Sequence, residues 1–302
     1  MLRLFLWLAV VLQVVGLHGT AFSQVAGSEP PTIGVVLLHG KQGHTARDTT
    51  LTYIDSAMTA AGMRVVTPEM AWSFRRLMDK PWSQAVDEIK LHVQALRAQG
   101  VKRIVLAGQS LGSPAVLSYA ATHDDVDALV LISPGHTPRY FYEGIPFAPT
   151  RVWVLKNEVD RARDLVQKGQ GHQPVQFRDI NVGGTFTVSV TPNIFLSYMD
   201  PDSDAEMSLT APKISSRVPV LWLMGKRDLL VSQGSAYVFD KLPPIRKANT
   251  PKLRVATLMP EAETPHLSST GFRKYYGPDR GSRAVLNLST AMQIGIQPCE
   301  QA

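Results

Sequence analysis

Apolar and polar positions follow two different periods along this chain of 302 residues. Short, almost wholly apolar runs occur at residues 32–38, 63–66, 103–107, 126–132, 218–224 and 253–258. Between them, apolar side chains recur at helical spacing over residues 51–61 and 83–99, after Pro114, and over 234–241. Buried strands that alternate with amphipathic helices are typical of a parallel sheet. We therefore expect an α/β fold with a mostly parallel sheet of about six strands flanked by helices.

Residues 135–217 interrupt this alternation. A helical pattern that carries Val159, Ala162 and Leu165 ends at Gly169, and two β-like runs follow at 175–180 and 185–190. The sequence NVGG joins those two runs, which is typical of a hairpin. We therefore expect an insert with its own helix and hairpin between two strands of the main sheet.

The motif GQSLG places Ser110 between an apolar run and a helical pattern. A serine hydroxyl becomes a useful nucleophile when a sharp strand-to-helix turn exposes it within reach of a base. Pro114 falls in the first turn of the expected helix, where a missing N–H is harmless. This context favours a nucleophile, and the alternative is a serine in a structural turn.

The first 23 residues have the pattern of an export signal. Arg3 provides a positive start, residues 4–15 an apolar core, and Ala21-Phe22-Ser23 the small residues that a signal peptidase reads. The apolar run is well short of the ~20 residues that span a bilayer. We expect cleavage after Ser23, a periplasmic or secreted protein, and no stable membrane insertion afterwards; the alternative is an uncleaved anchor.

Composition narrows the classes of partner and cofactor. The formal net charge is +6, and it falls to +5 without residues 1–23, which hold one arginine and no acid. The basic residues are scattered among acids, which argues against a nucleic-acid partner. Cys299 is the single cysteine, so the chain has neither an internal disulfide nor a Cys/His zinc motif. We expect no metal and no organic cofactor, and nothing in the sequence indicates an oligomeric state.

Four segments together resemble the α/β-hydrolase fold family over nearly all of residues 24–302. GVVLLHGKQGH is similar to the family's first strand and His-Gly turn, and GQSLG to its nucleophile elbow. PVLWLMGKRDLL and LRVATLMPEAETPH are similar to the strands that deliver its acid and its histidine. The resemblance implies a Ser110, Asp228, His266 triad in the family's chain order. It also implies that residues 135–217 are a lid. The chain departs from the family in one respect: few residues separate the expected cleavage point from the first strand, so we expect the family's usual leading antiparallel strands to be missing and the sheet to be reduced.

The catalytic base and acid each have an alternative. His266 follows the last strand and lies beyond Asp228, which favours it as the base, with His136 after an earlier strand as the second candidate. Asp228 would hold the imidazole in its reactive tautomer. The other interpretation of Asp228 is a turn residue that caps the next helix.

An oxyanion hole needs two backbone N–H groups. Leu111, which directly follows the nucleophile, offers one, and the resemblance implies that Lys41 offers the other, with Gln42 as the alternative. The ammonium of Lys41 has two interpretations, a solvated loop charge or a contact to a substrate carboxylate.

These observations predict a serine hydrolase that cleaves a small-molecule carboxylic ester or thioester through an acyl-enzyme. An amidase or peptidase would use the same triad. A non-catalytic envelope binding protein on the same fold is the alternative from another class, because one fold hosts many functions.

Overall fold

The computed structural model describes residues 31–44, 49–144, 149–181, 184–225, 234–244 and 254–259. The expected signal at 1–23 and the two candidates Asp228 and His266 lie outside these ranges. No helix in the described ranges combines the length and apolar character needed to cross a membrane.

Within these described ranges the main sheet has six strands in the order β2-β1-β3-β4-β7-β8, and each neighbouring pair runs parallel. This confirms the prediction of a mostly parallel sheet of about six strands. The apolar runs of the sequence form all six, with bounds close to those expected. They are β1 (Ile33–Leu38), β2 (Arg64–Val66), β3 (Arg103–Gln109), β4 (Ala128–Ile132), β7 (Val220–Gly225) and β8 (Arg254–Met259).

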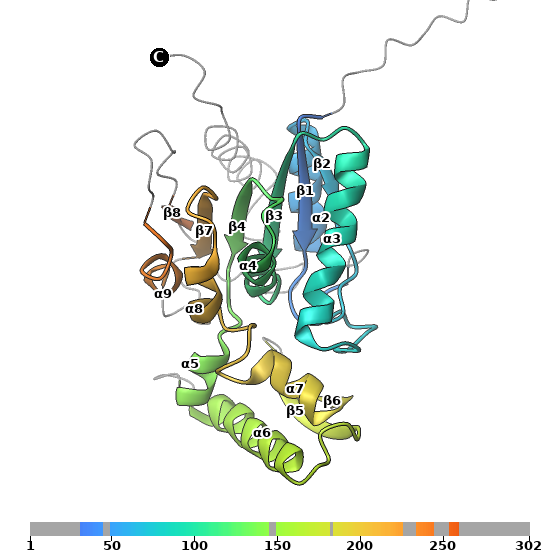
Figure 1. Ribbon diagram of the computed structural model, residues 1–302, viewed down its shortest axis with the longest axis vertical. Coiled ribbons are helices and arrows are strands. Elements are labelled where there is room, and N and C mark those ends of the chain that lie inside the picture. Colours follow the sequence, from blue (N-terminus) through green and yellow to red (C-terminus); the bar gives the residue numbers. More distant parts are fainter. Residues whose placement is uncertain are drawn as a thin grey trace, which may run out of the picture. The chain divides into compact units, whose positions relative to one another are not determined.

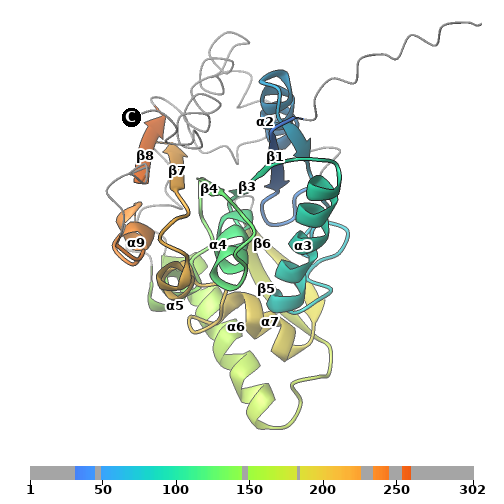
Figure 2. The same cartoon turned by 45° about the horizontal axis from the view of Figure 1, so that its top comes forward.

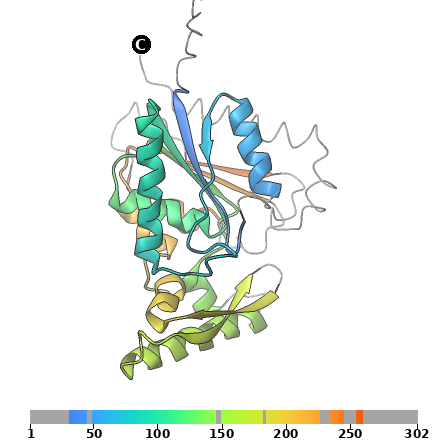
Figure 3. The same cartoon turned by 90° about the vertical axis from the view of Figure 1, so that its right-hand side faces the viewer.

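Helices cover both faces of this sheet (Figure 3). On one face lie α3 (Trp82–Ala98) and α4 (Gly112–Thr122), and on the other lies α2 (Thr49–Ala60). A short helix, α9 (Ala236–Phe239), follows β7. Alternate residues of β1 serve the two faces because side chains alternate along a strand: Val36 and Leu38 join the α3–α4 core, whereas Val35 and Leu37 join the α2 core.

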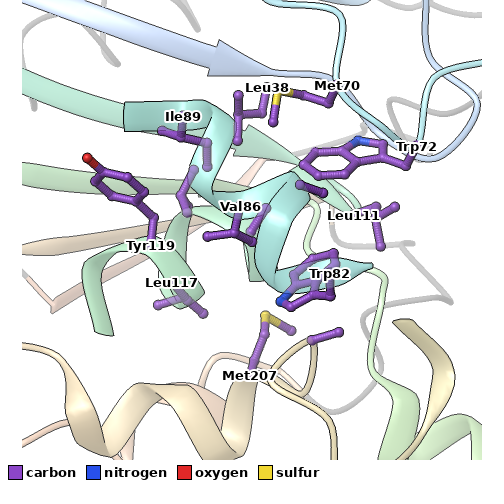
Figure 4. Close-up of a cluster of buried hydrophobic side chains, with 14 of the residues drawn as sticks. Leu38, Met70, Trp72, Trp82, Val86, Ile89, Leu111, Leu117, Tyr119 and Met207 are labelled. Carbon is purple, nitrogen blue, oxygen red and sulfur yellow. The ribbon is translucent and has the colours of Figure 1, made fainter. Parts of the chain in front are cut away.

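The α3–α4 core continues toward the carboxyl ends of the strands as an aromatic cluster (Figure 4). The rings of Trp72 and Trp82 stack with centroids 5.8 Å apart, and Trp82 meets Tyr198 edge-on at 5.1 Å. All three side chains are fully or almost fully buried. Tyr198 belongs to the insert, so this apolar cluster joins the insert to the helix layer.

The insert lies between β4 and β7, at the carboxyl ends of the strands (Figure 1). Its two β-runs form an antiparallel hairpin that pairs Ile180 with Thr185, as the sequence predicted. Whether the insert acts as a lid stays a prediction. Its elements are α5 (Pro138–Glu143), α6 (Pro149–Gln167), β5 (Val175–Asn181), β6 (Gly184–Val190), α7 (Pro192–Met199), α8 (Met207–Thr210) and the 3-10 helix Ala211–Lys213.

Candidate active site

Ser110 occupies the sharp turn between β3 and α4. Its φ angle is +51°, a left-handed conformation that non-glycine residues adopt only where the surrounding structure enforces it. The Ser110 amide donates a 2.9 Å hydrogen bond to the carbonyl of Ile132 at the end of β4, and the Ser110 carbonyl accepts one from Ser113. The serine is therefore held by its backbone, and its side chain is partly exposed.

The two glycines of the motif allow this turn to close. A Cβ on Gly108 would lie 2.1 Å from the carbonyl oxygen of Gly112, and a Cβ on Gly112 would lie 2.8 Å from the carbonyl oxygen of Leu38. Contacts under 3.0 Å force the backbone to move. Both glycines are thus required by the close approach of β3, α4 and β1.

Residues 39–43, which we call the β1 loop, run past this turn. His39 is fully buried, its Nδ1 lies 2.8 Å from the Gly40 carbonyl, and its Nε2 accepts a 3.0 Å bond from the Met70 amide. The proton is therefore assigned to Nδ1. The Trp72 indole donates to the His39 carbonyl at 2.9 Å. His39 therefore holds the β1 loop through these bonds.

The β1 loop approaches the serine directly. A Cβ on Gly40 would lie 3.0 Å from the Cβ of Ser110 and 3.6 Å from its Oγ. Leu111 is the N-cap residue of α4 and is fully buried. The Leu111 amide therefore lies at the N-terminus of a helix beside Ser110, where the helix dipole favours negative charge.

The backbone N–H groups of Lys41 and Gln42 differ in whether they donate a hydrogen bond. Gln42 has a φ of +56°, and its N–H donates to the Trp72 carbonyl at 2.9 Å. Within the described ranges, the N–H of Lys41 and that of Leu111 donate to no acceptor. One of these two N–H groups follows Ser110 directly in the chain, and the other follows Gly40, the loop residue that approaches Ser110.

The ammonium of Lys41 is buried in an ion pair. Its Nζ lies 2.7 Å from Oδ1 of Asp179 and donates to the Ile180 carbonyl at 3.1 Å. The exposed fractions of the two charged side chains are 7% and 0%. The expectation of a solvated loop charge is therefore wrong, because β5 of the insert brings a carboxylate to it. The second interpretation was that this ammonium contacts a substrate carboxylate. In the structure the ammonium is already paired with the carboxylate of Asp179.

Asp228 and His266 follow two strands at one edge of the sheet. β7 and β8 lie side by side at the edge opposite β2 (Figure 2). Gly225 and Met259, the last residues of these strands, face each other in the parallel register. Asp228 comes three residues after one strand end and His266 seven after the other. Ser110 follows the central strand β3, at the same carboxyl ends of the parallel strands.

His136 is a poor base. Its Nε2 lies 2.8 Å from the carbonyl of Tyr198, to which it donates, and its side chain is almost fully buried. Burial, assisted by the positive charge of Lys41, lowers the pKa of His136 to about 3. Its Nε2–H is thus engaged in a hydrogen bond, and the low pKa makes the other ring nitrogen, Nδ1, a weak base. Among the described residues, no group of three or more histidine, cysteine, aspartate or glutamate side chains is arranged to hold a metal ion.

This geometry agrees with the comparisons to known proteins. The family model "Serine aminopeptidase, S33" matches residues 29–250, well over half of the chain. The chain belongs to the S33 family of α/β hydrolases. No curated protein sequence matches it.

Solved structures with the same fold share little sequence with this S33 hydrolase. Est1E from Butyrivibrio proteoclasticus, solved with ferulic acid, is 15% identical with a TM-score of 0.58, over 89% of this chain and 91% of its own. A carboxyl esterase from Bacillus coagulans is 14% identical with a TM-score of 0.58, over 89% and 92%. The monoacylglycerol lipase of Paleococcus ferrophilus is 20% identical with a TM-score of 0.55, over 87% and 96%.

Sequence reasoning missed Asp179 and Asn181 of this S33 hydrolase. The signal for Asp179 was available, because it continues the inward-facing alternation of Val175 and Phe177 along β5. A carboxylate on the buried side of a strand requires a partner. Nothing in the sequence indicates that this partner is Lys41, 138 residues away.

Proposed function

We propose that this S33 hydrolase cleaves carboxylic esters or thioesters through an acyl-enzyme in which Ser110 is the nucleophile. One observation carries the proposal. The backbone of Ser110 adopts φ +51° in a strand-to-helix turn that only glycines at 108 and 112 can close. Such a strained turn at the carboxyl ends of the strands exposes a hydroxyl for attack on a carbonyl.

In the proposed reaction His266 takes the proton of the Ser110 hydroxyl as its oxygen attacks the acyl carbon. His266 then gives this proton to the leaving alkoxide or thiolate. In the second half of the reaction His266 takes a proton from a water molecule as the water oxygen attacks the acyl-enzyme, and returns it to the Ser110 oxygen as the carboxylic acid is released. Asp228 orients the imidazole and stabilises its charged form. The adjacent ends of β7 and β8 support this pairing, since each residue follows one of them closely.

We propose that the backbone N–H groups of Leu111 and Lys41 form the oxyanion hole. Within the described ranges neither N–H donates to an acceptor, whereas the Gln42 N–H donates to the Trp72 carbonyl. The closeness of Gly40 to Ser110 supports the role of the next amide in the chain. Removal of one such donor costs about 100- to 1,000-fold in kcat in serine hydrolases.

An amidase or peptidase is the second candidate, because the description of the family names an aminopeptidase. The named esterases and lipase among the solved structures favour esters, although at this identity they show only the fold. Parallel assays with 4-nitrophenyl butyrate and with aminoacyl 4-nitroanilides separate the two. We expect turnover of the ester and little turnover of the anilides.

A fluorophosphonate probe tests the nucleophile. We expect wild-type protein to be labelled at Ser110, and Ser110→Ala to be unlabelled and at least about a thousandfold slower on the ester. Ser113→Ala is the matched control, because it removes the other serine hydroxyl of this turn. This variant should still be labelled at Ser110. Wild-type protein that is neither labelled nor active would favour the non-catalytic envelope binding protein.

We also propose that the protein is exported, on the strength of the pattern in residues 1–23. The mature protein should then begin at Gln24 and occur in the periplasm or the medium. N-terminal sequencing of the protein from its native host would contradict export if it found Met1 in place.

A further inference from the structure

We propose that the β5–β6 hairpin of the insert positions the β1 loop for catalysis, with Asp179 and Asn181 as positioning residues that act through Lys41. This inference rests on the proposed function, because it concerns the loop whose Lys41 amide would bind the oxyanion. The insert would then support the catalytic centre itself, whether or not it also acts as a lid.

The hairpin contacts the loop through both its side chains and its backbone. Asp179 pairs with the Lys41 ammonium at 2.7 Å, and the Ile180 carbonyl accepts from the same ammonium at 3.1 Å. The amide of Asn181 donates to the Lys41 carbonyl at 3.0 Å and lies 3.1 Å from Oε1 of Gln42. Three consecutive hairpin residues therefore hold two consecutive loop residues.

Burial gives these contacts their strength. Asp179 is fully buried, and its Oδ1 also accepts a 2.6 Å bond from the Ile180 amide. A charge in such a site is tolerated only beside its partner, so any movement of Lys41 away from Asp179 would leave both charges unpaired. The ion pair therefore resists displacement of the loop far more than an exposed pair would.

The contact at Lys41 matters because the opposite side of the loop is held separately. The Gln42 amide is bonded to the Trp72 carbonyl, and Gln42 keeps a positive φ. The peptide group that joins Lys41 to Gln42 is thus bonded to the core through the Gln42 N–H and to the hairpin through the Lys41 carbonyl. The Lys41 N–H belongs to the preceding peptide group, so these bonds set its position through the Cα of Lys41. A misplacement of about 1 Å at a reacting group can cost about a hundredfold in rate.

Asn181→Ala tests the proposal most cleanly, since it removes the two amide contacts and leaves the buried ion pair in place. The matched control is Asn193→Ala in α7, whose side-chain amide lies beside the His172 ring within the insert. Asp179→Asn is the second variant. Each is assayed for kcat and KM on 4-nitrophenyl butyrate and for inhibition by an alkyl trifluoromethyl ketone, which forms a tetrahedral oxyanion on the serine.

For Asn181→Ala we expect kcat to fall about 10- to 100-fold with KM nearly unchanged, because the lost interaction acts in the transition state. The ketone inhibition constant should rise by a similar factor. Asp179→Asn should show the same pattern, and Asn193→Ala should match the wild type. Thermal melting identifies any variant that fails to fold. If Asp179→Asn fails to fold, the result for Asn181→Ala decides the proposal.

Wild-type kcat and ketone affinity in Asn181→Ala would overturn the proposal, and so would an equal loss in Asn193→Ala. A loss of kcat without a loss of ketone affinity would overturn it as well, because the loop would then be correctly placed for the oxyanion. Fluorophosphonate labelling of the wild type separates this failure from a failure of the proposed function, in which Ser110 would stay unlabelled.

Discussion

The indole N–H of Trp72 donates a 2.9 Å hydrogen bond to the carbonyl of His39, and so ties the buried aromatic cluster to the β1 loop. The same tryptophan accepts from the Gln42 amide through its own carbonyl. Trp72, from the segment after β2, thus supports the β1 loop at both ends. A substitution of Trp72 should therefore affect both the stability of the protein and the activity that depends on the loop.

Trp72→Phe should lower both stability and activity. The substitution keeps an aromatic ring but leaves the buried His39 carbonyl without this donor, a loss of about 1–3 kcal/mol in the free energy of unfolding. We expect kcat to fall by about tenfold, because the loop carrying the Lys41 amide loses a support. Urea denaturation and ester hydrolysis measure the two effects.

Trp82→Phe is the matched control for that variant. Its indole donates to Ser118 Oγ at 3.0 Å, a bond of the same kind that lies away from the β1 loop. We expect a comparable loss of stability and an unchanged kcat. Equal losses of kcat in both variants would show that activity follows global stability and does not depend on the bond to His39.

Gly108→Ala should destabilise the protein through a steric clash. Its Cβ would lie 2.1 Å from the carbonyl oxygen of Gly112, which is backbone that no side-chain rotation can relieve. We expect a loss of about 3 kcal/mol or more, at the upper end of overpacking effects. Gly169→Ala is the control, since it has a positive φ of +76° and no atom within 4 Å of its added Cβ.

The control should lose only about 1–2 kcal/mol, the cost of a left-handed backbone for alanine. Chemical denaturation of both variants measures the difference. If Gly108→Ala were no less stable than Gly169→Ala, the close approach of the turn to the helix start would be contradicted.

His136 should make stability depend on acid pH. Burial and the nearby charge of Lys41 lower its pKa to about 3, below the ordinary 6.5 of the unfolded chain. Between those values the unfolded state binds the extra proton, so stability is lost as pH falls from about 6.5 toward 3. By pH 4 this group alone should cost about 3 kcal/mol relative to neutral pH.

His136→Gln isolates that contribution, because glutamine can donate to the Tyr198 carbonyl and does not titrate. We expect the wild type to lose more free energy of unfolding than the variant between pH 7 and pH 4. Denaturation curves at several pH values measure it. Parallel losses in the two proteins would mean that His136 titrates normally in the fold.

The buried ion pair should show strong coupling between its two partners. Asp179→Asn leaves the Lys41 ammonium buried without its counter-charge and should cost about 3–5 kcal/mol. Lys41→Met combined with Asp179→Asn removes both charges, and should restore much of the loss because no unpaired charge remains. A double-mutant cycle from urea denaturation measures the coupling. Additive effects of the two substitutions would contradict a direct buried pair.

The sheet, its flanking helices and the turn at Ser110 could be predicted from the sequence, because each depends on neighbouring residues. Alternation of apolar runs and helical spacing identified β1, β2, β3, β4, β7 and β8 with small errors at the ends. The glycines around Ser110 are likewise a local signal, since a cramped turn requires them wherever it occurs.

The partners of buried polar groups depended on tertiary structure. Lys41 and Asp179 are 138 residues apart, and no local pattern distinguishes a lysine that will be solvated from one that a distant strand will bury. Likewise only the folded loop shows that the Gln42 N–H donates to the Trp72 carbonyl, whereas the Lys41 N–H donates to no acceptor within the described ranges. The sequence by itself determined where the chain forms strands, helices and the serine turn, because backbone preference and periodic burial act over a few residues. The folded chain decided which charges and donors meet, because burial of a polar group is tolerated only where packing brings its partner to it.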